Sequence, residues 1–134
     1  MRYVFDTDTL SNLVKKKPSD LLLRYLARVP RDRQFTTAIT AGEMIYGAYR
    51  SQRSEFFMSK IETLLLPNVT ILPFDEGSAK VYGKTRAELE KQGRSVSEPD
   101  LRIASIAIQH GFTLVTGNLK HFQGIPMLMV ENWL

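Results

Sequence analysis

The stretch RYVFDTDTLSNL, residues 2–13, decides the fold of this chain. Residues 3–5 (YVF) form a run of β-forming residues without polar interruption, which is typical of a central strand of a parallel sheet covered on both faces. The run stops at Asp6, and Leu10 and Leu13 then recur at helical spacing. A strand that ends in an aspartate and turns into a helix places that carboxylate at the carboxyl edge of the sheet, where open α/β sheets bind ligands. Asp6 is therefore the first candidate for chemistry.

Two interpretations of Asp6 and Asp8 are open at this point. Together with the threonines between and after them, the two aspartates could act as helix caps or turn formers. One aspartate is enough for a cap, however, and this chain places two carboxylates two residues apart directly after a buried strand. We therefore favour an anionic cluster that binds a cation.

Length and composition describe one ordinary globular domain. The chain has 134 residues, of which 43% are hydrophobic and 24% charged, so we expect a single domain over residues 1–134 with a core of its own. No apolar run has the length of a membrane span, and the N-terminus lacks the hydrophobic region of a signal peptide. A cytoplasmic protein without a membrane partner is the expectation.

The residue types limit the metals and partners that the chain can bind. It has no cysteine, which excludes disulfides and thiolate metal sites, and its two histidines argue against zinc. Any metal must be held by oxygen atoms, which favours Mg²⁺ or Mn²⁺. A net charge of +4 permits a polyanionic partner without requiring one.

Beyond the opening, strands alternate with helices along the chain. We expect further strands at residues 34–39, 69–72 and 112–116, and a short fifth strand at 127–130. Helical periodicity predicts the intervening helices, listed here by residue range: 19–29, 40–50, 57–65, 75–92 and 99–110. This order implies an α/β fold with three α/β/α layers and a central, mainly parallel sheet of four to five strands.

Two polar residues follow the second and fourth expected strands. Glu43 lies in the first turn of the helix expected from Thr40, where Thr-x-x-Glu also fits a capping box, and the local pattern alone favours the cap. Asn118 comes just after the fourth strand, where it could be a turn residue or could contribute its amide oxygen to a site.

Asp100 has the same alternative, because Ser97-x-x-Asp100 also fits a cap. Asp100 lies one turn before Ile103 and Ala104, however, on the stripe of the helix that faces the sheet. A carboxylate aimed inward is costly to desolvate unless it is paired or bound to a cation.

The joint placement of these residues is harder to explain by caps. All of them fall at carboxyl ends of strands or at helix starts that can reach that edge: Asp6, Asp8, Glu43, Asp100 and Asn118. Several carboxylates within a few ångströms would repel one another and raise one another's pKa values, and a divalent cation removes that cost.

The chain resembles the PIN-domain ribonucleases and, within them, the VapC-type toxins of bacterial and archaeal toxin–antitoxin pairs. The matching segments span nearly the whole chain in the family's order and spacing. They are VFDTDTLSNL (4–13), TAITAGEMIYGA (37–48), residues 81–89, EPDLRIASIAI (98–108), TLVTGNLKHF (113–122) and VENWL (130–134).

The resemblance implies a site and partners. Asp6, Glu43 and Asp100 correspond to the family's invariant acids, which would hold Mg²⁺ or Mn²⁺. Asn118 matches a fourth position that carries Asp or Asn, and Thr116 matches a hydroxyl that lines the site; both would position water or phosphate. Asp8 stands where many members have Asn, so we expect it, with Asn118, to tune the metal from outside its ligand shell. The family resemblance also implies a homodimer, neutralised by a small antitoxin whose tail fills the acidic groove.

The expected activity is that of a metal-dependent endoribonuclease that inhibits translation and growth. The metal would activate water for attack on the scissile phosphate, leaving 5′-phosphate and 3′-hydroxyl ends. An acidic site does not attract RNA by itself, so Lys15 to Lys17 and Arg86 are candidates to steer the RNA backbone.

Two other functions compete with the nuclease. The sequence of residues 6–10 (DTDTL) also matches the first motif of haloacid-dehalogenase-type phosphatases, with Asp6 as nucleophile. That fold needs a later acidic pair after a strand, and residues 117–120 contain no acid. The other alternative is a non-catalytic PIN-like module that binds nucleic acid. The absence of one of the three carboxylate residues would have supported this alternative, but Asp6, Glu43 and Asp100 are all present.

Overall fold

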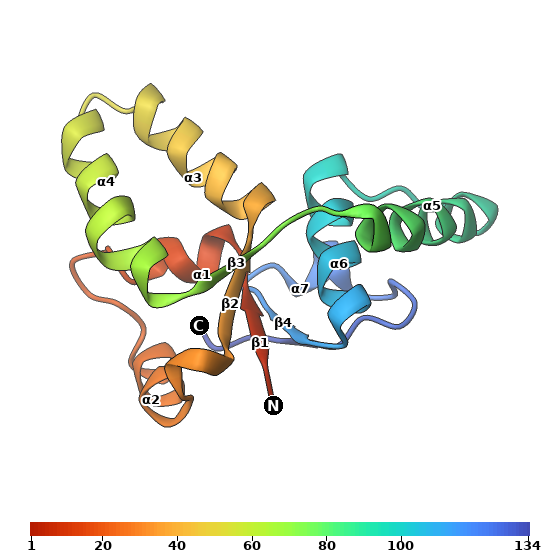
Figure 1. The fold of residues 1–134 in the computed structure, drawn as a ribbon, viewed down its shortest axis with the longest axis horizontal. Coiled ribbons are helices and arrows are strands. Elements are labelled where there is room, and N and C mark those ends of the chain that lie inside the picture. The colour runs from red at the N-terminus through yellow and green to blue at the C-terminus, as the bar shows by residue number, and fades with distance from the viewer.

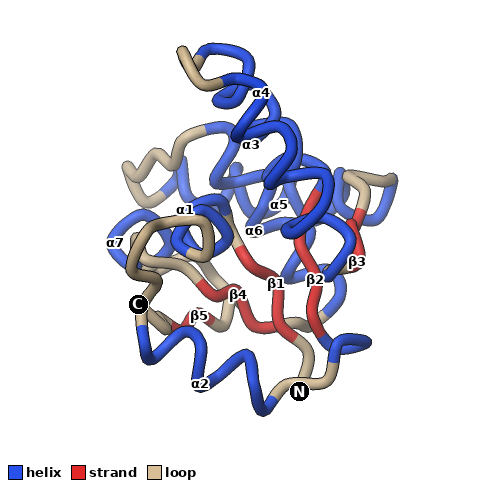
Figure 2. The backbone as a smooth tube through the Cα atoms, turned by 90° about the vertical axis from the view of Figure 1, so that its left-hand side faces the viewer, coloured by secondary structure: helices blue, strands red, loops and turns tan.

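A computed structural model describes residues 1–134 and shows a five-stranded sheet at the centre of the chain. All strands are parallel, in the order β3-β2-β1-β4-β5, so the expected α/β fold with a central parallel sheet is confirmed (Figure 2). The strands are β1 (Tyr3–Phe5), β2 (Gln34–Thr37), β3 (Thr70–Leu72), β4 (Thr113–Val115) and β5 (Val130–Glu131).

Helices cover both faces of the sheet, which gives the expected three layers (Figure 1). On one face lie α1 (Thr7–Asn12), α2 (Asp20–Arg28), α3 (Ala38–Arg50) and α4 (Ser54–Lys60). On the other face lie α5 (Glu76–Lys91), α6 (Glu98–His110) and α7 (Leu119–Phe122). Short helical segments connect these elements: two 3-10 turns (Arg31–Arg33 and Leu66–Asn68) and one π-helical turn (Ile61–Leu65). None of the helices combines the length and the apolarity that crossing a membrane requires.

Each face of the sheet has its own hydrophobic core. Val4 points into a cluster with α6 residues such as Ile106, while Phe5 points into a second cluster with Leu10 and Trp133. Because side chains alternate along a strand, the short apolar run of β1 supplies both cores at once. Val4 and Phe5 are at most 1% exposed, as a central strand covered on both faces requires.

The order of the strands places the switch point of the sheet between β1 and β4. The chain runs from β1 outward to β2 and β3, and then returns to the other side of β1 to form β4 and β5. At such a point the loops after two neighbouring parallel strands diverge and leave a crevice at the carboxyl edge. Asp6 follows β1 and Thr116 follows β4, so both residues lie at that edge.

The bounds of two expected strands are wrong, and one helix was not expected. The second strand ends at Thr37 rather than at residue 39, because the Thr37 hydroxyl caps α3 by accepting the N–H of Thr40 at 3.0 Å. The fifth strand is Val130–Glu131 rather than 127–130, because Met127 sits in a tight turn with φ of 69°. Helix α7 is too short to show a hydrophobic period and was not expected.

Candidate active site

Asp6 lies at the junction of β1 and α1 and is 4% exposed. Its backbone N–H still belongs to the sheet and donates to the carbonyl of Val115 at 3.2 Å. Its side chain accepts the N–H of Thr9 at 3.0 Å, so Asp6 is the N-cap of α1, as the simpler interpretation of this residue holds. The cap fixes the carboxylate at the mouth of the switch point.

The environment of Asp6 opposes its negative charge. Burial raises the pKa of the Asp6 carboxyl, hydrogen bonds from Thr116 and Thr9 lower it in part, and the nearby charge of Asp8 raises it. No lysine, arginine or histidine forms an ion pair with Asp6. A buried carboxylate without a cationic partner is an expensive arrangement, and it is the chemistry that a bound cation relieves.

One hydroxyl and one amide from the β4 side interact with the two aspartates: Thr116 with Asp6, and Asn118 with Asp8. Thr116 is fully buried, and its side chain lowers the pKa of the Asp6 carboxyl by hydrogen bonding, so it lies where the family resemblance expects a hydroxyl. The side-chain amide of Asn118 donates to the carboxylate of Asp8, so these two exposed residues form a polar bridge between α1 and the loop after β4. The structure therefore brings together four of the predicted site residues at the edge between β1 and β4.

Glu43 joins this edge from α3. It is the sixth residue of that helix and not part of its first turn, so the expected capping box at Thr40 is wrong; Thr37 is the cap. The Glu43 carboxylate accepts a hydrogen bond of 2.9 Å from the hydroxyl of Thr7, which directly follows Asp6. This contact, which links α3 to the start of α1, could not be read from local spacing.

Asp100 lies in the first turn of α6 and contacts α7, the helix that begins directly after Asn118. Ser97 caps α6 by accepting the N–H of Asp100 at 3.4 Å, so the cap at Ser97 is present, while the Asp100 side chain has its own partner. That side chain is 23% exposed and lies 3.3 Å from Nδ1 of His121 on α7. His121 was not among the expected site residues, because a lone histidine in a short helix carries no sequence signal.

The donor set suits a hard divalent cation, but the acids hold other partners. With the side chains as they stand, no three carboxylates or imidazoles are gathered closely enough to hold a metal ion. Glu43 is bonded to Thr7 and Asp100 is paired with His121, while Asp6 is buried beside Thr116. The oxygen donors present are those that Mg²⁺ and Mn²⁺ prefer. Asp6 also accepts the N–H of Thr9, and Asp8 accepts the amide of Asn118.

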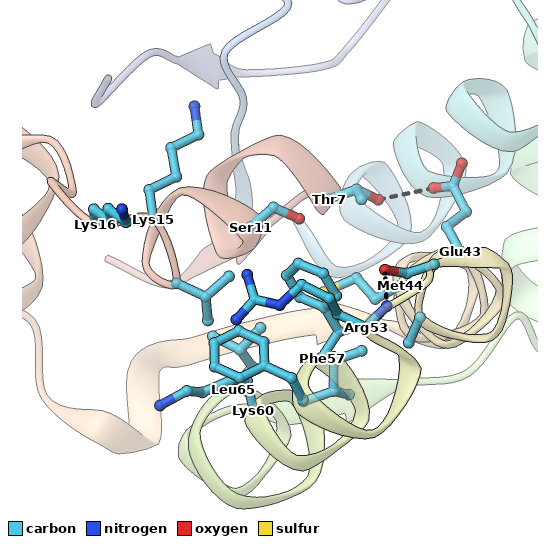
Figure 3. A pocket seen from close by; sticks show the side chains of 16 residues that line it. Thr7, Ser11, Lys15, Lys16, Glu43, Met44, Arg53, Phe57, Lys60 and Leu65 are labelled. Atoms are coloured by element: carbon cyan, nitrogen blue, oxygen red, sulfur yellow. Dashed lines mark hydrogen bonds between the residues drawn. The ribbon is translucent and has the colours of Figure 1, made fainter.

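A groove of about 570 Å³ opens beside Glu43 between α1, α3 and α4. Figure 3 shows Thr7 and Glu43 at one end of this groove and Lys15 and Lys16 at the other. Its floor is apolar, and cations stand on its rim, where the Arg53 guanidinium lies 4.1 Å from the centre of the Phe56 ring. The apolar lining residues include Val14, Met44, Ala48, Phe56, Phe57, Ile61 and Leu65.

The structure separates the two groups of basic residues that were expected to steer RNA. Lys15 and Lys16 line the groove beside the acidic edge. Arg86 instead takes part in a network on α5 and α6, where it bonds Tyr82 at 2.9 Å, Glu98 at 3.1 Å and Glu90 at 3.2 Å. These partners compensate the charge of Arg86, whose pKa they raise, so the lysines are the better candidates.

Comparison with known proteins agrees with this geometry. The PIN domain family model matches residues 3–125. Ribonuclease VapC1 of Haemophilus influenzae is 37% identical over 99% of this chain and 98% of its own length. The tRNA(fMet)-specific endonuclease VapC of Salmonella typhimurium is 32% identical, again over 99% of this chain and 98% of its own.

Solved structures show the same fold at similar identity. VapBC2 from Rickettsia felis, bound to a DNA fragment from its promoter, contains a chain that is 33% identical, with a TM-score of 0.92 and full coverage of both chains. VapBC-1 from nontypeable Haemophilus influenzae contains a chain with a TM-score of 0.88 and 36% identity, over 99% of this chain. The chain therefore belongs to the PIN-domain family, among the VapC ribonucleases.

Proposed function

We propose that this chain is a metal-dependent endoribonuclease that acts as the toxin of a toxin–antitoxin pair and thereby inhibits translation and growth. The observation that carries the proposal is the buried carboxylate of Asp6, which lies at the switch point of the sheet without a cationic partner. Relatives that are named ribonuclease or endonuclease cover nearly the full length of the chain, which supports the same activity.

Asp6, Glu43 and Asp100 would hold Mg²⁺ or Mn²⁺. The ion, when bound, would lower the pKa of a bound water for attack on phosphorus and stabilise charge on the leaving oxygen. Thr116 orients the Asp6 carboxylate through its hydroxyl, and Asn118 holds Asp8 beside it. Because water rather than the 2′-hydroxyl is the nucleophile, the products would carry 5′-phosphate and 3′-hydroxyl ends.

The groove beside Glu43 is our candidate for the antitoxin site. An amphipathic segment would bury its apolar side chains on the floor and place acidic side chains against Lys15, Lys16, Arg53 and Lys60 on the rim. The solved relatives are VapBC assemblies, which supports a protein partner. We also propose a homodimer and a cytoplasmic location, as the sequence led us to expect.

The competing functions are not favoured by the site. A phosphatase nucleophile must meet its substrate, whereas Asp6 is 4% exposed and already accepts hydrogen bonds from Thr9 and Thr116. The loop after β4 brings Asn118 and no acid to the edge. A non-catalytic module would have no need for a buried, unpaired carboxylate at the switch point.

The test is cleavage of purified RNA by the full chain, with Mn²⁺ and with EDTA. We expect 5′-phosphate products only with Mn²⁺, and loss of cleavage in a folded Asp6→Ala variant. Asp32→Ala is a matched control, because Asp32 is an exposed aspartate just before the amino end of β2, at the opposite edge of the sheet. Equal cleavage by Asp6→Ala and the parent would refute the proposed function.

A further inference from the structure

The loop between α5 and α6 is tied to the end of α7 by one side chain. Arg94 donates from Nη1 to the carbonyl of Gly124 at 2.8 Å and from Nη2 to the carbonyl of Gln123 at 2.7 Å. Both carbonyls directly follow α7, so the guanidinium caps the carboxyl end of that helix with two charge-assisted hydrogen bonds.

The backbone of Arg94 is itself anchored to a long helix. Gly93 ends α5 with φ of 70° and donates to Glu90 at 3.0 Å, and the N–H of Arg94 donates to Leu89 at 2.9 Å. This pair of bonds is a Schellman motif, which fixes the direction in which the chain leaves the helix. The backbone of Arg94 is therefore fixed to the end of the 16-residue helix α5, and its side chain extends from there to α7.

Gly124 leaves the space that the guanidinium fills. Its φ is 79°, a conformation that residues with a side chain rarely adopt. A Cβ atom at this position would lie 2.3 Å from Nη1 and 2.9 Å from Cζ of Arg94. A substitution at Gly124 would therefore displace the guanidinium and also strain the backbone.

Helix α7 depends on such a tie and carries two groups of the candidate site. It has four residues, of which only Phe122 is buried, and a helix this short is not stable by itself. At its start Asn118 bonds Asp8, and within it His121 lies 3.3 Å from Asp100.

We propose that Arg94 is a positioning residue of the nuclease site: by holding the end of α7, it keeps Asn118 and His121 against Asp8 and Asp100. The expected effect of Arg94 on cleavage rests on the proposed function. The expected effect of Arg94 on α7 rests only on its contacts with that helix. Arg94 does not reach the acids, so its influence passes through the helix.

The experiment compares Arg94→Ala, Arg94→Lys, Gly124→Ala and the Arg94→Ala/Gly124→Ala double variant. Arg102→Ala is the control, since Arg102 is an arginine of similar exposure on α6 that pairs with Glu98. Hydrogen exchange is measured at the N–H of Gln123, which bonds Leu119 at 2.8 Å within α7, and kcat and KM are measured for RNA cleavage.

We expect Gln123 to exchange at least about tenfold faster in the three single variants, because a hydrogen bond to a charged group contributes more than a factor of ten. The value of kcat should fall about 10–100-fold, as for other groups that orient metal ligands, with KM nearly unchanged. Lysine should not rescue, since it lacks the fork that reaches two carbonyls. The double variant should be no worse than the poorer single variant, because both substitutions break one contact.

Two results would overturn the proposal. Unchanged exchange at Gln123 in Arg94→Ala would show that Arg94 does not hold α7. A direct charge contact between Arg94 and RNA would give a different pattern. Arg94→Ala would then raise KM, Arg94→Lys would restore cleavage, and Gly124→Ala would cleave RNA as the parent does. The exchange measurement needs neither RNA nor metal, so it tests whether Arg94 holds α7 even if the parent cleaves no RNA. Absence of cleavage by the parent would count only against the proposed function.

Discussion

The hydroxyl of Thr7 donates a hydrogen bond of 2.9 Å to the carboxylate of Glu43 and so joins the first turn of α1 to α3. Thr7 directly follows Asp6, the buried carboxylate at the switch point. Two of the three acids that we assign to the metal are thus linked by a single side chain. Because the rest of Glu43 is exposed, this contact is what keeps its carboxylate at the edge of the site.

Thr7→Val should therefore weaken cleavage without unfolding the protein. We expect a loss of about 10–100-fold in activity or Mn²⁺ affinity, as for other groups that orient a metal ligand. The change in unfolding free energy should stay within about 1 kcal/mol, because the lost bond is exposed to solvent. Thr63→Val is the control, since the Thr63 hydroxyl bonds only Ser59 within its own helical turn. Equal Mn²⁺ affinity in both variants would contradict the prediction.

Asp6→Asn should raise the stability of the metal-free protein at neutral pH. Burial raises the folded-state pKa of Asp6, so its ionised form is the one that the fold disfavours. The stability that protonated Asp6 contributes is fully present at pH values below the pKa of Asp6 in the unfolded chain. It is lost as the pH rises through the pKa of Asp6 in the folded protein. Asparagine caps a helix about as well as aspartate and carries no charge.

The gain from Asp6→Asn should therefore be largest above the folded pKa and should disappear in acid. Urea unfolding in EDTA at several pH values measures it, with Asp32→Asn as the exposed control. A variant that is destabilised equally at every pH would show that the aspartate acts only as a cap.

Mn²⁺ should stabilise the parent more than variants that lack one acid. A ligand that binds only the folded state adds RT ln(1 + [L]/Kd), about 2.7 kcal/mol at a hundredfold excess over Kd. Since Thr37 and Ser97 cap α3 and α6, Glu43→Gln and Asp100→Asn should cost little in EDTA and should lose most of the Mn²⁺ effect. Thermal melts of the three proteins in EDTA and in Mn²⁺ measure both quantities. An identical Mn²⁺ shift in all three would mean that these acids do not bind the ion.

Beryllofluoride should not modify Asp6. An aspartyl nucleophile forms an acyl-phosphate that beryllofluoride mimics, whereas a metal-activated water leaves no covalent intermediate. Asp6 is 4% exposed, and one of its carboxylate oxygens already accepts the N–H of Thr9, which leaves little room for in-line attack on a bulky phosphate ester. Mass spectrometry and fluorine NMR after incubation with Mg²⁺ test this. A beryllofluoride adduct on Asp6 would favour the phosphatase over the nuclease.

Met127→Gly should stabilise the protein by about 0.5–1 kcal/mol. Met127 has φ of 69° in the turn closed by the hydrogen bond from the N–H of Leu128 to the carbonyl of Ile125, and the residue is 86% exposed. The left-handed conformation costs a residue with a Cβ about 1–2 kcal/mol, and glycine avoids this cost. The greater freedom of glycine in the unfolded chain offsets part of the resulting stabilisation. Met129→Gly, in a strand-like position next to β5, should instead destabilise. The free energies of urea unfolding of the two variants give the comparison.

The sequence by itself determined the layers of this protein and the edge at which its site lies. An apolar run that ends in Asp6, followed by alternating strands and helices, is enough to place that carboxylate at the carboxyl end of a central parallel strand, because the periods of strands and helices are local properties. Thr116 was named only by the family resemblance, and the parallel pairing of β1 with β4 places it at the same edge as Asp6. The bounds of several elements were not determined in this way: the start of α3 at Ala38 depended on the choice between competing caps at Thr37 and Thr40, and the short helix α7 was not expected.

The tertiary structure decided which side chains meet at that edge. Thr7 meets Glu43 and His121 meets Asp100 because separate helices pack over the same end of the sheet, and no spacing along the chain encodes how far each helix slides or turns. The tie from Arg94 to the end of α7 is of the same kind, since its partners lie about thirty residues away. Contacts of this sort depend on side-chain volumes and on packing across layers, which is why a sequence can name the acids of a site and only the folded chain can show what holds them.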